Sequence, residues 1–176
     1  MTREQLEHLI RAAADIADDD ELIILGSQAI LGQFPNAPPE LCVSADLDLY
    51  PKNRPDRADL IEGSIGELSP FHETFGYYAH AAGPTTAVLP AGWQERLIAV
   101  RGPNTRGATG WCLEIHDLAI SKGIAGRDKD LEYLSVLARE GLARLDTLRE
   151  RLVETDVPPA VRELARAHLE RLFAAG

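Results

Sequence analysis

The sequence predicts an α+β fold, with strands in its first two thirds and helices in its last third. Residues 22–25 form a short apolar run whose length suits a buried strand better than a helix. Residues 46–50 alternate acidic and apolar side chains, as a strand with one polar face does. From residue 114 onward, leucines recur at helical spacing.

The N-terminal segment predicts an amphipathic helix over residues 2–17. Its apolar residues recur three and four positions apart and form one stripe. Thr2 is a suitable N-cap for this helix. The acidic run at residues 18–20 ends it, and we interpret that run as a solvated turn rather than a metal site.

The middle third predicts short elements separated by turns, because glycine and proline recur throughout it. A helix is expected over residues 56–68, followed by a partly extended aromatic segment over 71–81. Three strand candidates follow, at residues 85–89, 97–100 and 111–113.

The last third predicts further helices at about residues 144–153 and 158–174, the second opened by two prolines. We therefore expect two parts. A core of α and β elements spans residues 1–114, and a helical segment packed on that core spans residues 115–176.

The composition narrows the range of functions. The formal charge of −10 argues against a broad, non-specific nucleic-acid surface, because neutralising phosphates needs clustered Lys and Arg. No apolar run reaches the roughly 18 residues of a membrane span, and the charged start is not a secretory signal. The two cysteines show no Cys-x-x-Cys spacing. We expect a cytoplasmic protein with reduced thiols and no membrane partner.

Asp46 and Asp48 are the first candidate site residues. Successive side chains of a strand point to opposite faces, so both carboxylates share one face of the strand. Two neighbouring carboxylates repel each other unless solvent, a basic partner or a metal ion compensates. Mg²⁺ takes oxygen ligands and completes its shell with phosphates and water, so the pair predicts a Mg²⁺ site. The alternative is an edge strand with an acidic outer face.

Gly26 and Ser27 form the second candidate feature. They follow the buried strand at residues 22–25 and precede a short apolar helix. Glycine lets the backbone approach a ligand closely, and the N–H groups that open a helix favour phosphate. A proline-rich loop around residues 35–39 separates this turn from Asp46.

The elements follow in the order strand, Gly-Ser turn, helix, loop and a second strand with Asp-x-Asp. This order resembles the nucleotidyltransferase fold of the DNA polymerase beta superfamily. The resemblance implies a nucleotidyltransferase-like mixed sheet flanked by helices, with a C-terminal helical segment. It implies that Gly26 and Ser27 bind the phosphates of an NTP substrate. It also implies that Asp46 and Asp48 bind Mg²⁺ and act in catalysis.

The segment at residues 117–130 extends the resemblance. It contains Lys122, then Arg127 after four intervening residues, and then Asp130. This pattern is similar to the late motifs of AbiEii-type and MenT-type nucleotidyltransferases, which are toxins of toxin–antitoxin pairs. The resemblance makes Lys122 a catalytic phosphate contact and Asp130 the distal catalytic carboxylate. Arg127 becomes a second cation for the nucleotide, or a partner that orients Asp130. By itself the segment also fits a solvated helix–turn–helix with alternating charges.

One departure from the superfamily concerns its third carboxylate, which many members place on a later central strand. The strand candidate at residues 85–89 contains no acid, and Glu114 is the nearest later acid at a strand end. His72, Glu73 and His80 lie in the aromatic segment, and we interpret them first as structural residues and second as residues lining a cleft.

Two functions from different classes follow. The first is Mg²⁺-dependent transfer of a nucleoside monophosphate from an NTP to a hydroxyl of an RNA end, a protein or a small molecule. The toxin resemblance adds an antitoxin protein as an expected partner. The second is a catalytically inactive module on the same fold that senses a nucleotide or binds another protein. The missing third carboxylate favours the second function.

Overall fold

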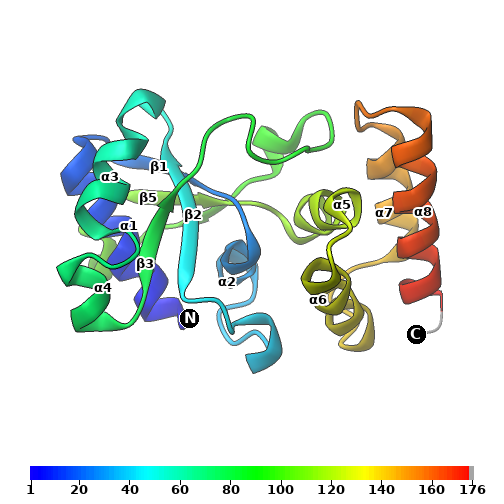
Figure 1. Cartoon of the computed structure of the whole chain (residues 1–176), viewed down its shortest axis with the longest axis horizontal. Coiled ribbons are helices and arrows are strands. Elements are labelled where there is room, and N and C mark those ends of the chain that lie inside the picture. The colour runs from blue at the N-terminus through cyan, green and yellow to red at the C-terminus, as the bar shows by residue number, and fades with distance from the viewer. Residues whose placement is uncertain (175–176) are drawn as a thin grey trace. The chain divides into compact units, whose positions relative to one another are not determined.

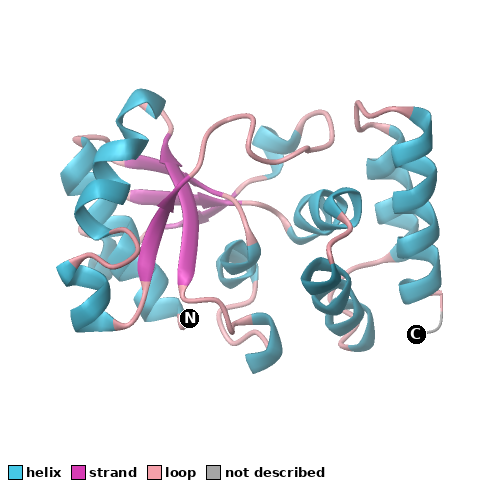
Figure 2. Cartoon of the chain, in the orientation of Figure 1, coloured by secondary structure: helices cyan, strands magenta, loops and turns pink. Residues whose placement is uncertain are grey.

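The computed structural model describes residues 1–174, which divide into two compact units. The first unit holds residues 1–86 and 97–113, and the second holds residues 87–96 and the described residues from 114 onward. The strands belong to the first unit, whereas the second unit is built from helices and loops over its described residues (Figure 2). The predicted α+β fold class is confirmed.

Five strands form one mixed sheet in the first unit: β1 (Glu21–Ile24), β2 (Asp46–Pro51), β3 (Tyr78–Ala81), β4 (Ile98–Val100) and β5 (Thr109–Cys112). Their order across the sheet is β3-β2-β1-β5-β4 (Figure 1). β1 pairs with β5 and β2 pairs with β3 in parallel, while the β1–β2 and β4–β5 pairs are antiparallel. The candidate strand β2 therefore lies between β1 and β3.

Four α-helices belong to the same unit: α1 (Arg3–Ala17), α2 (Ile30–Gln33), α3 (Ala58–Ile65) and α4 (Pro70–Phe75). In Figure 1, α1, α3 and α4 lie on one side of the sheet and α2 lies on the other. The core consists of fully buried aliphatic side chains from α1, α3, β1 and β2, namely Leu6, Leu9, Ile10, Leu22, Ile24, Leu47, Leu49 and Ile61. Removing this apolar surface from water is the main force that holds the sheet to its helices.

The described residues of the second unit form four α-helices: α5 (Ile115–Ala125), α6 (Asp128–Arg139), α7 (Leu145–Val153) and α8 (Pro159–Phe173). The segment 87–96 is bonded to them at two points. Arg96 donates two hydrogen bonds to the fully buried carboxylate of Asp117 on α5, with Nε–Oδ2 2.8 Å and Nη2–Oδ1 3.0 Å. The Ala91 N–H donates to the carbonyl of Glu154, at 3.1 Å.

Most predicted elements are confirmed with small shifts at their ends. The helices expected over residues 2–17, 56–68, 144–153 and 158–174 correspond to α1, α3, α7 and α8. The strand candidates at 97–100 and 111–113 correspond to β4 and β5.

The strand predicted over residues 85–89 is wrong, because that stretch forms a turn and an irregular loop. The strand next to β2 comes earlier, within the aromatic segment 71–81. That segment opens as α4, which Ser69 caps by accepting a hydrogen bond from the His72 N–H at 3.2 Å, and then forms β3. The aromatic side chains obscured this boundary, since they occur on both elements.

The acidic run at residues 18–20 is not the uniformly solvated turn that we predicted. Asp18 and Asp20 are exposed, but Asp19 is only 7% exposed. Its carboxylate accepts four hydrogen bonds, from the backbone N–H groups of Glu21, Asn53 and Arg54 and from Asn53 Nδ2. Asp19 thereby joins the turn before β1 to the turn after β2.

We expect Asp19→Asn to destabilise the fold by about 1.5–3 kcal/mol at neutral pH, because hydrogen bonds to a charged acceptor contribute that much. Burial acts to raise the pKa of Asp19, but the accepted hydrogen bonds outweigh it and hold the pKa below its ordinary value. A lowered pKa gives stability that is present above the unfolded-state value of about 3.9 and is lost as the pH falls through the folded value.

Urea unfolding at pH 7 and near pH 3 checks this prediction. The difference between wild type and Asp19→Asn is expected to shrink at the lower pH. Asp20→Asn is the control, since it changes an exposed carboxylate of the same turn. An equal difference for Asp19→Asn at both pH values would contradict the assignment of a charged acceptor.

Candidate functional site

Asp46 and Asp48 lie on one face of β2, as the alternation predicts. Both are partly exposed, whereas the leucines that alternate with them are fully buried. In the parallel β2–β3 pair, Asp46 lies opposite Tyr78 and Asp48 lies opposite His80. Two carboxylates therefore face outward beside an aromatic and an imidazole side chain.

His80 contacts Asp48 directly. Its Nδ1 lies 2.9 Å from Asp48 Oδ1, and its side chain is 51% exposed while that of Asp48 is 26% exposed. The hydrogen bond to Asp48 raises the pKa of His80 against the opposing effect of burial. Sequence reasoning assigned His80 a structural role first. The two-residue strand period puts Tyr78 and His80 on one face of β3. Once β3 is known to pair with β2, this period connects His80 with Asp48.

Gly26 lies against the same carboxylate. Its backbone has φ +57° and ψ −174°, a conformation that essentially only glycine adopts. A Cβ at this position would lie 2.9 Å from Asp48 Cγ and closer still to Oδ2. The backbones also join at this point, because the Leu25 N–H donates to the Asp48 carbonyl at 2.9 Å. Ser27 follows and opens the short 3₁₀ helix Ser27–Ala29. The Gly-Ser turn and the second aspartate of Asp-x-Asp are thus adjacent in space.

The donor set on β2 fits Mg²⁺. This ion is commonly held by one or two carboxylates and keeps water and substrate phosphates as its other ligands. Within residues 1–174, no group of three or more His, Cys, Asp or Glu side chains is arranged to hold a metal ion. Asp46 and Asp48 are the two carboxylates that could hold such an ion together with substrate phosphates and water.

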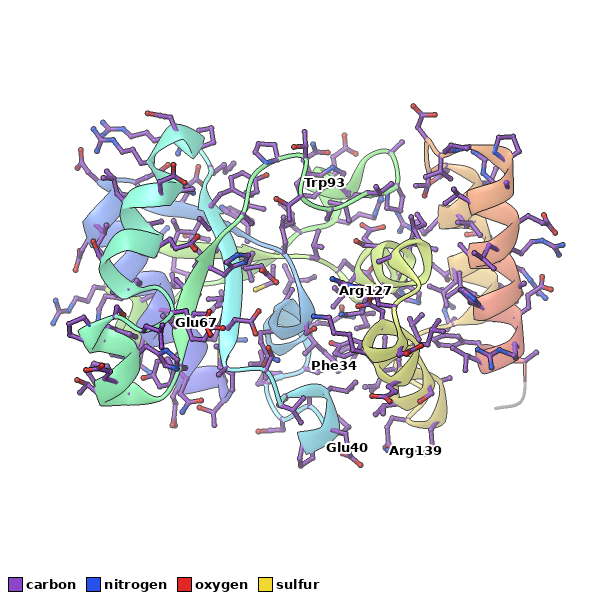
Figure 3. The ribbon with its side chains drawn as sticks, in the orientation of Figure 1. Phe34, Glu40, Glu67, Trp93, Arg127 and Arg139 are labelled. Carbon is purple, nitrogen blue, oxygen red and sulfur yellow. The ribbon has the colours of Figure 1, made fainter. Side chains whose placement is uncertain are left out.

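Lys122, Arg127 and Asp130 come together in the second unit. Asp130 is fully buried, and its Oδ1 accepts from Lys122 Nζ at 3.2 Å and from Arg127 Nη2 at 3.3 Å. Its Oδ2 accepts from Arg127 Nε at 2.6 Å. Burial acts to raise the pKa of Asp130, but the two cations outweigh it and lower the pKa. Arg127 precedes α6 and is labelled in Figure 3.

The environment of Lys122 differs from that of a solvated surface charge. Its side chain is only 10% exposed, and Nζ lies 4.4 Å from the centre of the Tyr133 ring. A cation over an aromatic face is attracted by the ring quadrupole. The burial of Lys122 and Asp130 contradicts the alternative of a fully solvated helix–turn–helix.

Glu114 is engaged at the start of α5. Its carboxylate accepts from the backbone N–H of His116 at 3.0 Å and lies 2.6 Å from His116 Nδ1. His116 Nε2 accepts the Arg144 N–H at 3.0 Å, so the ring proton belongs on Nδ1 and points to Glu114. Burial acts to raise the pKa of Glu114, but these bonds from His116 lower it overall. Glu114 therefore has a helix-capping role.

Comparison with protein families decides the broad class. The family described as "Nucleotidyltransferase of unknown function (DUF6036)" matches residues 4–170. The chain belongs to this nucleotidyltransferase family. The resemblance to a nucleotidyltransferase is thereby confirmed, and a nucleotide is the partner that the family implies. No curated protein and no solved structure matches this nucleotidyltransferase. None of its helices within residues 1–174 has the length and apolar character needed to cross a membrane.

Proposed function

We propose that this nucleotidyltransferase moves a nucleoside monophosphate from an NTP to a hydroxyl acceptor in the presence of Mg²⁺. One observation carries the proposal. The Asp48 carboxylate lies against the glycine-specific turn at Gly26, on the strand face that also carries Asp46. A turn without a side chain lets the backbone come close to both carboxylates, so a triphosphate that contacts this turn would lie beside the proposed metal ligands.

The first unit supplies the metal and triphosphate ligands of the proposal. Asp46 and Asp48 would hold Mg²⁺, and Gly26 and Ser27 would contact the phosphates. When bound, Mg²⁺ offsets the negative charge that develops on the phosphate oxygens during transfer. Since the NTP brings further oxygen ligands, two protein carboxylates are sufficient.

The proposed transfer is a single displacement at the α-phosphorus. The acceptor oxygen forms a bond to this phosphorus while the bond to the bridging oxygen breaks, and pyrophosphate leaves with the electron pair. The acceptor proton passes to the carboxylate of Asp46 or Asp48, which acts as a general base. This step needs no oxidant, reductant or further co-reactant.

The second unit supplies the proposed cations. The resemblance proposes Lys122 and Arg127 as fixed cations of the kind that offset charge on phosphates in phosphoryl-transfer sites. Asp130 was predicted to be a distal catalytic carboxylate. Because it is fully buried and accepts from both cations, we assign it the role of positioning them.

A finer proposal makes the chain a toxin of the AbiEii or MenT type, with an RNA end as the acceptor and an antitoxin protein as partner. The order of Lys122, Arg127 and Asp130 supports it, as does their shared cluster. A formal charge of −10 favours a small local groove for RNA over an extended surface. A protein side chain or a small molecule remains the alternative acceptor.

A second candidate function is nucleotide sensing or protein binding without turnover. It is favoured by β3, whose sequence Tyr-Ala-His-Ala places no carboxylate beside Asp46 and Asp48. In this case the site keeps its ligands for a metal–nucleotide complex but transfers nothing.

Thermal melts with ATP, GTP, CTP and UTP, with and without Mg²⁺, test the proposal. A ligand that binds the folded state at about 100 times its dissociation constant stabilises that state by about 2.7 kcal/mol. We expect an Mg²⁺-dependent rise in melting temperature with at least one NTP, and its loss in Asp46→Ala/Asp48→Ala. The control Asp59→Ala removes an exposed carboxylate of the same unit and should keep the rise.

Label transfer from α-phosphate-labelled NTP then separates the two functions. Transfer that disappears in the double variant supports the enzyme, and binding without transfer supports the module. The absence of a shift with every NTP in wild type would contradict the transferase and nucleotide sensing, and would leave protein binding as the function.

A further inference from the structure

His80 is a polar residue beside the candidate site to which the proposed reaction assigns no role. It lies on β3, which is the end strand of the sheet, and its side chain is half exposed. It lies directly opposite Asp48 in the β2–β3 pair, with Nδ1 2.9 Å from Asp48 Oδ1. Two strands distant in sequence thus bring an imidazole onto a proposed metal ligand.

The direction of this hydrogen bond follows from the chemistry of the two groups. An ionised carboxylate only accepts hydrogen bonds, so His80 Nδ1 carries the proton and donates it. This bond engages Oδ1 of Asp48, while Oδ2 lies against Gly26. The carboxylate is therefore bounded on both sides, by an imidazole N–H and by a turn without a side chain.

We propose that His80 is a positioning residue for Asp48, which holds the carboxylate in the orientation that binds the metal–nucleotide complex. This inference rests on the proposed function. Outer hydrogen-bond partners orient the ligands of metal ions, and their loss typically costs about 10–100-fold in metal affinity or activity. His80 provides such a partner from a strand that carries no acid.

A purely structural role for His80 leads to a different expectation. A half-exposed side chain on an end strand contributes little to the core, and surface substitutions usually change stability by about 0.5 kcal/mol or less. A structural role thus predicts a small stability change and unchanged ligand binding. Positioning of Asp48 predicts a small stability change together with a large loss of ligand binding.

Mn²⁺ is the probe for the test, with ATP, GTP, CTP and UTP added in turn, and the free ion is measured by electron paramagnetic resonance. We expect His80→Ala to weaken nucleotide-dependent Mn²⁺ binding about 10–100-fold. His80→Asn should recover most of it, because the asparagine amide offers an N–H donor close to the position of Nδ1. His72→Ala is the matched control, since His72 contacts Tyr78 and the Leu68 N–H and should leave binding unchanged.

The outcomes separate this inference from the proposed function. If Asp48→Ala abolishes binding while His80→Ala binds like wild type, the role of His80 is wrong and the function stands. If wild type binds no Mn²⁺–nucleotide complex, or Asp46→Ala/Asp48→Ala binds it equally well, the function fails and the role of His80 falls with it. If His80→Ala unfolds, a folded His80→Leu decides, because leucine keeps apolar bulk but has no N–H donor. Weak binding then supports the inference, and wild-type binding overturns it.

Discussion

Gly26→Ala is expected to weaken Mg²⁺-dependent nucleotide binding by about 100-fold, the upper range for disturbing the surroundings of a metal ligand. The backbone at this position has φ +57° and ψ −174°, which side chains other than hydrogen essentially exclude, at a cost of about 1–3 kcal/mol. The added methyl group would also lie 2.9 Å from Asp48 Cγ and displace that carboxylate. Calorimetric titration with Mg²⁺ and each NTP, together with urea unfolding, measures both effects.

Gly76→Ala is the matched control for this prediction. Gly76 also has a positive φ, of +77°, but among the described residues no atom beyond its chain neighbours lies within 4 Å of its added Cβ. It should lose stability through backbone strain alone and keep nucleotide binding.

A double-variant cycle strengthens the comparison. Asp48→Ala removes the group that the new methyl would meet, so it should recover part of the stability that Gly26→Ala loses. Independent, additive effects of the two substitutions on stability would show that Gly26 and Asp48 do not contact each other as described.

Asp130→Ala should destabilise the second unit by about 3 kcal/mol or more, as breaking a buried ion pair does. The fully buried carboxylate accepts from the ammonium of Lys122 and from the guanidinium of Arg127. Burial lowers the pKa of Lys122, and the Asp130 carboxylate opposes that effect. Removing the carboxylate therefore makes the buried ammonium less stable in its charged form. The free energy of unfolding in urea at pH 7 is the measurement.

The control for this change is Asp128→Ala, two residues earlier on α6. Asp128 is exposed in the first helical turn, where its charge contributes about 0.3–1 kcal/mol through the helix dipole. The double variant Asp130→Ala/Lys122→Met should recover part of the lost stability, because it removes the buried ammonium as well. Equal losses for Asp128→Ala and Asp130→Ala would refute the buried cluster.

The elements predicted best were those with a strong local period. Helix α1 follows a regular apolar stripe, and α7 and α8 follow leucine spacing, so local pattern and tertiary packing agree. The alternation over residues 46–50 located β2 and assigned Asp46 and Asp48 to one face. The strand at 85–89 was predicted wrongly because a short run of β-favouring residues has no partner strand, and propensity alone does not create one.

Local sequence patterns did not predict the roles of residues whose hydrogen-bond partners or neighbours lie far away in the sequence. In the sequence, Asp19 is one of three adjacent acidic residues. In the structure, three of the four hydrogen bonds that it accepts come from residues 53 and 54. The same applies to the closeness of Gly26 to Asp48, since a glycine in a sequence shows neither its φ nor its neighbours.

The sequence by itself determined the α+β class, the shared face of Asp46 and Asp48, and the Gly-Ser turn, because each depends on local backbone geometry that repeats within a few residues. Only the tertiary structure decided that β3 pairs in parallel with β2 and brings His80 to Asp48. Only it decided that Asp130 is buried between two cations. Strand pairing and side-chain burial are contacts between separate parts of the chain, and their energies come from packing rather than from local preference.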